Sequence, residues 1–108
     1  MFKDNESYSI IKSILLSSKP KKQFLKAREE SGVFLVTSNG MNLHFLNEIA
    51  GRFLSLCDGK VSVDNIIDEI LLEYDVNRDV LESDILDLIC DLQRKRLIYI
   101  DPLEIDYE

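Results

Sequence analysis

The spacing of apolar and polar residues changes along the chain, and these changes mark the expected elements. Residues 6–17 place apolar side chains at helical spacing, which predicts a short helix that ends before Pro20. Residues 23–46 contain three strand-like runs, separated by Glu-Ser-Gly at 30–32 and Ser-Asn-Gly at 38–40. An Asn-Gly pair favours a hairpin because both residues tolerate positive φ. This region therefore predicts a three-stranded antiparallel meander.

The third strand and three helices complete the expected fold. The strand spans residues 41–46, and Asn47 follows it in the position of a helix N-cap. Gly59 suits the left-handed residue that ends the first helix, and Asp64 is expected to cap the second. A third helix runs from about Arg78 to Lys95, before a strand-like run at 97–100. The fold class is α+β, of winged helix-turn-helix type, with a three-stranded antiparallel sheet followed by three helices.

The third helix has apolar residues on two sides. A stripe of Leu and Ile at positions 81, 85, 88 and 92 is the expected core face. A second side, well round the helix from this stripe, has Leu86 and Cys90, flanked by Glu82, Ile89 and Gln93. Two readings of this second side are open: a wide core face against the other helices, or a groove that takes a ligand. The opposite side carries Asp84, Asp87 and Asp91, and is most simply a solvated face, with contact to basic leader residues or to the partner enzyme as the alternative.

Charge is distributed unevenly along the chain. The whole chain has 13 Lys and Arg against 20 Asp and Glu, for a net charge of −7. Residues 1–28 have a net charge of +5, and the remaining 80 residues have −12. The predicted hairpin at 33–46 contains no Lys or Arg, and the third helix is acidic. Such a surface repels DNA phosphates, which argues against nucleic acid as a partner.

Candidate chemistry is sparse. Cys57 and Cys90 both lie in apolar helical patterns and are expected to be buried free thiols. These two distant cysteines and the single histidine, His44, lack the spacing of metal ligands, so no metal or cofactor is expected. No catalytic motif accompanies His44, which is read as a surface or groove-lining imidazole, and we expect no enzymatic activity. No apolar run is long enough to span a bilayer and the first residues do not read as a secretory signal, so the expected compartment is the cytoplasm, with no membrane partner.

An ordered set of short motifs runs from Leu46 to Ile98. The motifs are Leu-Asn, Ala-Gly, Leu-Cys-Asp-Gly, Val-x-x-Ile, Glu-Tyr-Asp, Asp-Ile-Leu-x-Leu-Ile-x-Asp-Leu and Leu-Ile. Their residues are Leu46, Asn47, Ala50, Gly51, Leu56, Cys57, Asp58, Gly59, Val63, Ile66, Glu73, Tyr74, Asp75, Asp84, Ile85, Leu86, Leu88, Ile89, Leu92, Leu97 and Ile98. This set, with the stretch at 26–36, resembles the PqqD-like family over about residues 21–100. Residues 1–20 are then an N-terminal extension and 101–108 an acidic tail, and Arg96 stands where the family often has Gly.

The resemblance implies a RiPP recognition element, a winged-helix module that binds the leaders of ribosomally made, modified peptides. In this family the leader adds as a strand against the third strand of the sheet and rests on the third helix. The expected peptide-binding residues are Met41, Asn42, Leu43, His44, Phe45 and Leu46 in the strand, and Glu82, Leu86, Ile89, Cys90 and Gln93 in the helix. The second expected partner is a separate modifying enzyme, often a radical S-adenosylmethionine protein. The alternative is an acidic winged-helix interaction module with another partner, including a transcription-associated one.

Overall fold

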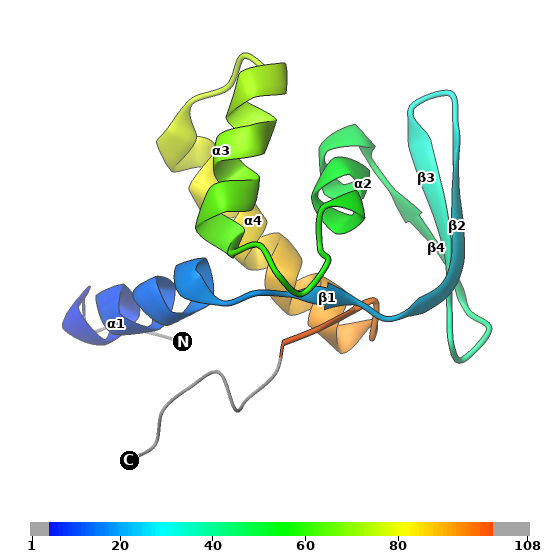
Figure 1. Cartoon of the computed structure of the whole chain (residues 1–108), viewed down its shortest axis with the longest axis horizontal. Helices are drawn as coiled ribbons and strands as arrows, with labels where there is room; N and C mark the ends of the chain where they lie inside the picture. The colour runs from blue at the N-terminus through cyan, green and yellow to red at the C-terminus, as the bar shows by residue number, and fades with distance from the viewer. Residues whose placement is uncertain (1–4, 101–108) are drawn as a thin grey trace.

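The computed structural model describes residues 5–100, and the expected acidic tail at 101–108 lies outside them. The elements are α1 (Asn5–Ser17), β1 (Lys21–Lys22), β2 (Phe24–Glu30), β3 (Val33–Ser38), β4 (Leu43–Leu46), α2 (Glu48–Ser55), α3 (Val63–Glu73), α4 (Arg78–Arg94) and β5 (Ile98–Tyr99). The sheet β2–β3–β4 stands at one side of the molecule, beside α2, and the other helices extend away from it (Figure 1). The predicted N-terminal helix and the predicted sheet followed by three helices are confirmed, and the run at 97–100 forms β5, which pairs with the unpredicted β1.

The first hairpin closes through a two-residue turn. Ser31 and Gly32 have φ values of +53° and +82°, and Glu30 pairs with Val33 across them. Positive φ at both central residues gives the twist that a two-residue hairpin needs. The turn predicted at Glu-Ser-Gly is therefore confirmed.

The second hairpin turns differently from the prediction. Met41 N donates to Ser38 O, and Ser38 N donates to Asn42 O, both at 2.8 Å. Positive φ falls on Met41, at +69°, and not on the Asn-Gly pair before it. This is the pattern of a turn followed by one left-handed residue, which needs a longer loop than a tight Asn-Gly hairpin. As a result, β4 begins at Leu43, two residues later than expected.

The helices after the sheet begin at side chains that cap them. Asn47 Oδ1 accepts a hydrogen bond from the N–H three residues on, at 2.8 Å, which confirms the predicted cap of α2. The cap of α3 is Ser62 and not Asp64, since Ser62 Oγ accepts from the N–H three residues on, at 3.2 Å. Asp64 lies instead in the first turn, where a carboxylate favours the positive end of the helix dipole. Asn77 caps α4 in the same way as Asn47 caps α2.

The first helix after the sheet is shorter than the position of Gly59 suggested. It ends at Ser55, with Leu56 as its C-cap. Gly59 has the expected positive φ, +81°, but serves the following loop, where its N–H donates to Pro20 O at 2.9 Å. The loop between α2 and α3 is thereby tied to the segment that leads into β1.

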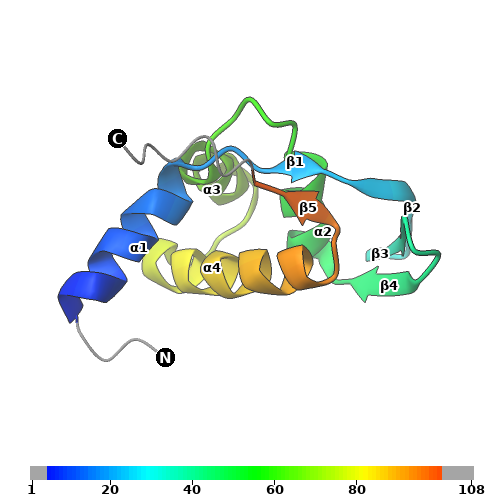
Figure 2. The same cartoon turned by 90° about the horizontal axis from the view of Figure 1, so that it is seen from below.

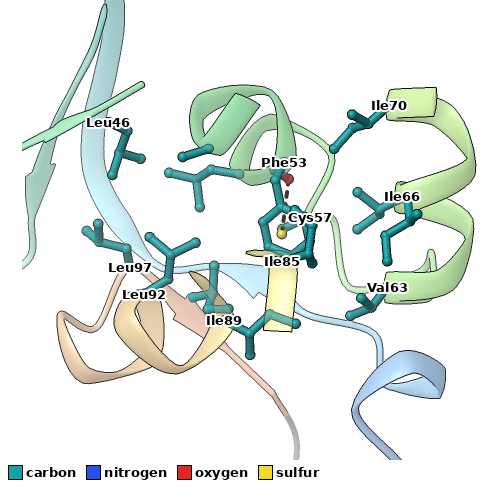
Figure 3. Packing of buried hydrophobic residues seen from close by; sticks show 14 of the residues in the cluster. Leu46, Phe53, Cys57, Val63, Ile66, Ile70, Ile85, Ile89, Leu92 and Leu97 are labelled. Atoms are coloured by element: carbon teal, nitrogen blue, oxygen red, sulfur yellow. Dashed lines mark hydrogen bonds between the residues drawn. The ribbon is translucent and has the colours of Figure 1, made fainter. Parts of the chain in front are cut away.

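The core lies between α2, α3 and α4 and is closed by the segment that contains β5 (Figure 3). Its fully buried side chains include Phe53, Cys57, Val63, Ile66, Ile67, Ile70, Ile89 and Leu92. Cys57 Sγ donates to Phe53 O at 3.3 Å, and burial raises the pKa of the Cys57 thiol to about 12. The expected burial of Cys57 is confirmed, whereas the same expectation for Cys90 is wrong because Cys90 is exposed.

The sheet contacts α2 most closely at Gly51. A Cβ atom on Gly51 would lie 2.0 Å from Cδ2 of Phe34, which projects from β3. Only a residue without a side chain allows the ring and the helix to approach this closely. This contact fixes where the sheet, and with it β4, stands relative to the helices.

The predicted N-terminal helix is present as α1 and packs on the helical part of the domain. In Figure 2, α1 lies beside the N-terminal half of α4. Leu15 and Leu16 pack against the core, and Lys12 Nζ lies 2.9 Å from Glu82 Oε1 of α4. The strand β1 follows α1 and pairs with β5. Sequence did not predict β1, because two residues are too few to show a periodicity.

Candidate functional site

The outer edge of β4 is open. Within residues 5–100, β4 is the last strand of its sheet and nothing pairs with its second edge. Ser38 N donates to Asn42 O, and the antiparallel register continues two residues on at His44. Hydrogen-bonded pairs alternate in such a ladder. The backbone N–H and C=O groups of Leu43 and Phe45 therefore point away from β3, toward the open edge.

The side chains of β4 alternate between the two faces of the sheet. Leu43 and Phe45 point away from the helices and are 56% and 67% exposed. His44 and Leu46 share the face toward the helices. His44 is half-buried, and its Nε2 atom is buried without a hydrogen-bond partner among the described residues.

Three of the six strand residues predicted to bind peptide are placed differently from the prediction. Met41 and Asn42 belong to the turn before β4 and not to the strand. Leu46 is 5% exposed and belongs to the core. The remaining three, Leu43, His44 and Phe45, form the accessible part of the strand.

A cavity of about 420 Å³ lies between α4 and the start of α2. Its lining includes Asn47, Ile49, Val80, Asp84, Asp87 and Leu88. Asn47 follows β4 directly, so this acidic cavity begins where the strand ends. Leu88, predicted to be core, is only partly buried and contributes to the apolar floor. The side chains of Asp84 and Asp87 have no ion pair or hydrogen bond with other described residues.

The helix residues that the sequence offered as either a groove or a wide core face do not line the acidic cavity. Leu86 and Ile89 are 7% and 0% exposed and belong to the core. Glu82 contacts Lys12 of α1, and the hydrogen bond from Lys12 holds the pKa of the Glu82 carboxyl below its usual value. Of the two readings, the wide core face is the correct one for Leu86 and Ile89. Cys90 and Gln93 are exposed but line neither the acidic cavity nor the one described next.

A second cavity, of about 640 Å³, lies at the opposite end of β4. Its lining includes Gln23, Asn39, His44, Arg94, Lys95 and Arg96, from the hairpin and the C-terminal turn of α4. Lys95 Nζ lies 2.9 Å from Asp91 Oδ2, and this hydrogen bond holds the pKa of the Asp91 carboxyl below its usual value. Arg96 has no ion pair with the described residues. This basic cavity was not predicted, because it joins segments 23, 39–44 and 94–96 that are distant in sequence.

Residues 5–100 contain no group of three or more His, Cys, Asp and Glu side chains placed to hold a metal ion. In the same residues no helix has the length and apolar character needed to cross a bilayer.

Residues 32–98 match the family described as coenzyme PQQ synthesis protein D (PqqD). The chain belongs to the PqqD family. The matched region begins in the first hairpin turn and ends in β5, so it contains β4, α4 and the lining of the acidic cavity. In this PqqD-family chain, α1, β1 and β2 precede the matched region.

One solved structure is similar to this PqqD-family chain in fold: TbiB1 in complex with the TbiA(beta) leader peptide. The two align with a TM-score of 0.61 and 22% sequence identity, over 73% of this chain and 99% of that chain. A search of the curated proteins finds no match. The shared fold confirms the architecture predicted from the resemblance.

Proposed function

We propose that this PqqD-family chain is a non-catalytic recognition protein for the leader of a ribosomally synthesised precursor peptide. The leader adds as a strand to β4, and the core peptide is presented to a separate modifying enzyme. The observation that carries this proposal is the open edge of β4, with the N–H groups of Leu43 and Phe45 directed outward between two cavities on α4. The leader peptide bound to TbiB1, which has the same fold, supports it.

Backbone pairing alone is too weak for this function. Leu43 and Phe45 each offer one donor and one acceptor, and each hydrogen bond contributes about 0.5–1.5 kcal/mol net. Micromolar binding needs about 8 kcal/mol, and ordering a flexible peptide costs several more. Side chains of the leader must therefore enter the cavities beside β4. Leu88, Ile49 and Val80 provide apolar surface for them in the acidic cavity.

The modifying enzyme is the second proposed partner. Holding the leader on β4 raises the effective concentration of the core peptide near an enzyme bound to the same complex. We propose a radical S-adenosylmethionine protein for this role, because such enzymes often accompany the family that the sequence resembles. The encounter is assigned to the cytoplasm, where a ribosomally made precursor is synthesised.

Proline substitution at the open edge tests the proposal. Phe45→Pro removes an N–H that points outward, and we expect it to weaken binding of a labelled synthetic leader, taken from a precursor encoded beside the gene, at least tenfold. Glu29→Pro is the matched control, since Glu29 lies on β2 at the far edge of the same sheet. Phe45→Ala separates the loss of the side chain from the loss of the donor. Binding is measured by fluorescence anisotropy, after circular dichroism has shown that each variant is folded.

The three variants have distinct expected outcomes. Strand addition predicts that Phe45→Pro weakens binding more than Phe45→Ala does, and that Glu29→Pro leaves it within about twofold. Equal effects at the two edges, or wild-type affinity in Phe45→Pro, would contradict strand addition to β4. Either result would favour the alternative, an acidic winged-helix interaction module with another partner.

A further inference from the structure

Charge changes sign along the side of α4 that faces the open edge of β4. Toward the middle of the helix, Asp84 and Asp87 line the acidic cavity and are not neutralised by other described residues. At the C-terminal turn, Lys95 and Arg96 line the basic cavity. Asp91 lies between the two groups and is paired with Lys95 at 2.9 Å. A ligand that follows this side of α4 therefore meets first one sign of charge and then the other.

The strand β4 joins the two cavities. His44, near its start, lines the basic cavity, and Asn47, directly after its end, lines the acidic cavity. A peptide paired along β4 consequently spans both. Its side chains alternate between the outer face, beside Leu43 and Phe45, and the inner face toward α4. Only the inner set reaches the charged groups.

We propose that the order of charge along this groove selects the leader: its inner-facing side chains are acidic beside His44 and basic beyond Leu46. This inference rests on the proposed function and names the peptide chemistry that the same site takes. The acidic side chain meets Arg96 and Lys95, and the basic one meets Asp84 and Asp87. These contacts lie at the rim of the groove, where charges set specificity and association rate more than affinity.

The geometry also fixes the spacing of the two charges. A strand rises about 3.3 Å per residue, so residues that reach the two ends of the four-residue β4 lie roughly four positions apart. The spacing must be even, because both side chains point to the same face. An acidic and a basic residue three or five apart would place one of them on the outer face, away from α4.

A peptide selection tests the inference with the full chain. A random dodecapeptide library displayed on phage is selected on immobilised wild-type protein, on Lys95→Glu/Arg96→Glu and on Asp84→Lys/Asp87→Lys. The control variants are Lys60→Glu and Glu29→Lys, which change exposed charges away from the groove. Each variant is checked by thermal unfolding, and the neutral variants Arg96→Gln and Asp87→Asn replace any that do not fold. Synthetic copies of the enriched peptides are then titrated against every variant.

The wild-type protein is expected to enrich peptides with an acidic residue and a basic residue at an even spacing of about four. Reversal of the basic end is expected to weaken these peptides about tenfold, and a peptide with Lys in place of its acidic residue is expected to recover the loss. The two control variants are expected to stay within about twofold of wild type.

Two other results would separate the inference from the proposed function. Peptides that depend on the β4 edge, shown by their loss in Phe45→Pro, but that have no charge order would overturn the inference alone. No enrichment, or enriched peptides that bind Phe45→Pro as well as wild type, would overturn the proposed function and the inference with it.

Discussion

Two sides of α4 carry similar kinds of residues but have different surroundings. One side carries Glu82, Leu86 and Ile89, and it is closed by α1 and the core. The other side carries Asp84 and Leu88, and it lines a cavity beside the end of β4. Each side mixes apolar and acidic residues, so hydrophobicity does not tell them apart. The difference comes from what the rest of the chain places against each side.

In α4, the segments packed against each side determine which apolar side is open to a ligand. The N-terminal helix α1 lies outside the residues matched to the PqqD family. Its Lys12 contacts Glu82 on the side of α4 for which the sequence left a core face and a groove open. The available side is the one beside the open strand. Five substitutions, taken in four tests from the largest expected effect to the smallest, sharpen this comparison.

Truncation of one residue on each side of α4 has the largest expected effect. Ile89→Ala should lower the free energy of unfolding by about 2–5 kcal/mol, because it leaves a cavity at a fully buried position. Leu88→Ala should cost less stability, since Leu88 is only partly buried, but should weaken leader binding about tenfold, or about 1.4 kcal/mol. Urea unfolding and peptide titration of both variants measure the two effects. Unchanged binding in Leu88→Ala would contradict the assignment of the open side.

Substitution of Asn47 tests whether this residue serves mainly as the N-cap of α2 or also contacts the peptide. Asn47→Ala should destabilise the fold by about 1 kcal/mol, because it removes the hydrogen bond that begins α2. Binding by the folded variant should fall less than in Leu88→Ala. If thermal stability is unchanged while binding is lost, Asn47 is a contact residue of the cavity and not mainly a cap.

Arg96 directly follows Lys95, the C-cap of α4. It has a φ of +60°, in the left-handed region that costs a non-glycine residue about 1 kcal/mol. Arg96→Gly should therefore raise stability by about 0.5–1 kcal/mol. Thermal and urea unfolding check this, with Lys60→Gly as a substitution in another exposed loop. A loss of stability would show that the Arg96 side chain contributes more than its backbone strain costs.

The ion pair on the closed side should give the smallest effect, and one that depends on pH. The hydrogen bond from Lys12 lowers the folded-state pKa of Glu82, so the carboxylate contributes stability above its ordinary pKa of about 4.3. That contribution is lost as the pH falls through the lower, folded-state pKa. Glu82→Gln should therefore be less stable than wild type at pH 7, by at most about 1 kcal/mol, and the difference should shrink toward pH 3. Thermal unfolding across this range would refute the role of the pair if the difference were constant.

Local pattern predicted most of the fold. The meander, the cap at Asn47 and the long third helix follow from alternation, turn residues and helical spacing, all of which act within a few residues. The prediction failed at two positions where neighbouring residues offered alternative turn or cap residues. Asn-Gly suggested a tight hairpin, but the left-handed residue is Met41, and Ser62 caps α3 two residues before Asp64.

The site could be predicted only in part. The strand and its alternation follow from the sequence, and so does the position of Leu43 and Phe45 on one face. The correct side of α4 does not, because it depends on which segments, distant in sequence, bury Leu86 and Ile89 in the core. The basic cavity could not be predicted either, because its lining comes from the hairpin and from the end of α4, which are distant in sequence. One signal was available for the open side: positions 80, 84, 87, 88 and 91 share a helical face that has three acidic and two apolar residues.

Amide hydrogen exchange, followed by NMR with and without a bound leader peptide, tests strand addition to β4 most directly. The backbone N–H groups of Leu43 and Phe45 have no strand to pair with among the described residues and should exchange quickly in the free protein. On binding, both should become protected, while the N–H of Glu29 at the far edge of the sheet should not change. Protection that appears along β2, or on α4 with no change at Leu43 and Phe45, would contradict strand addition at this edge.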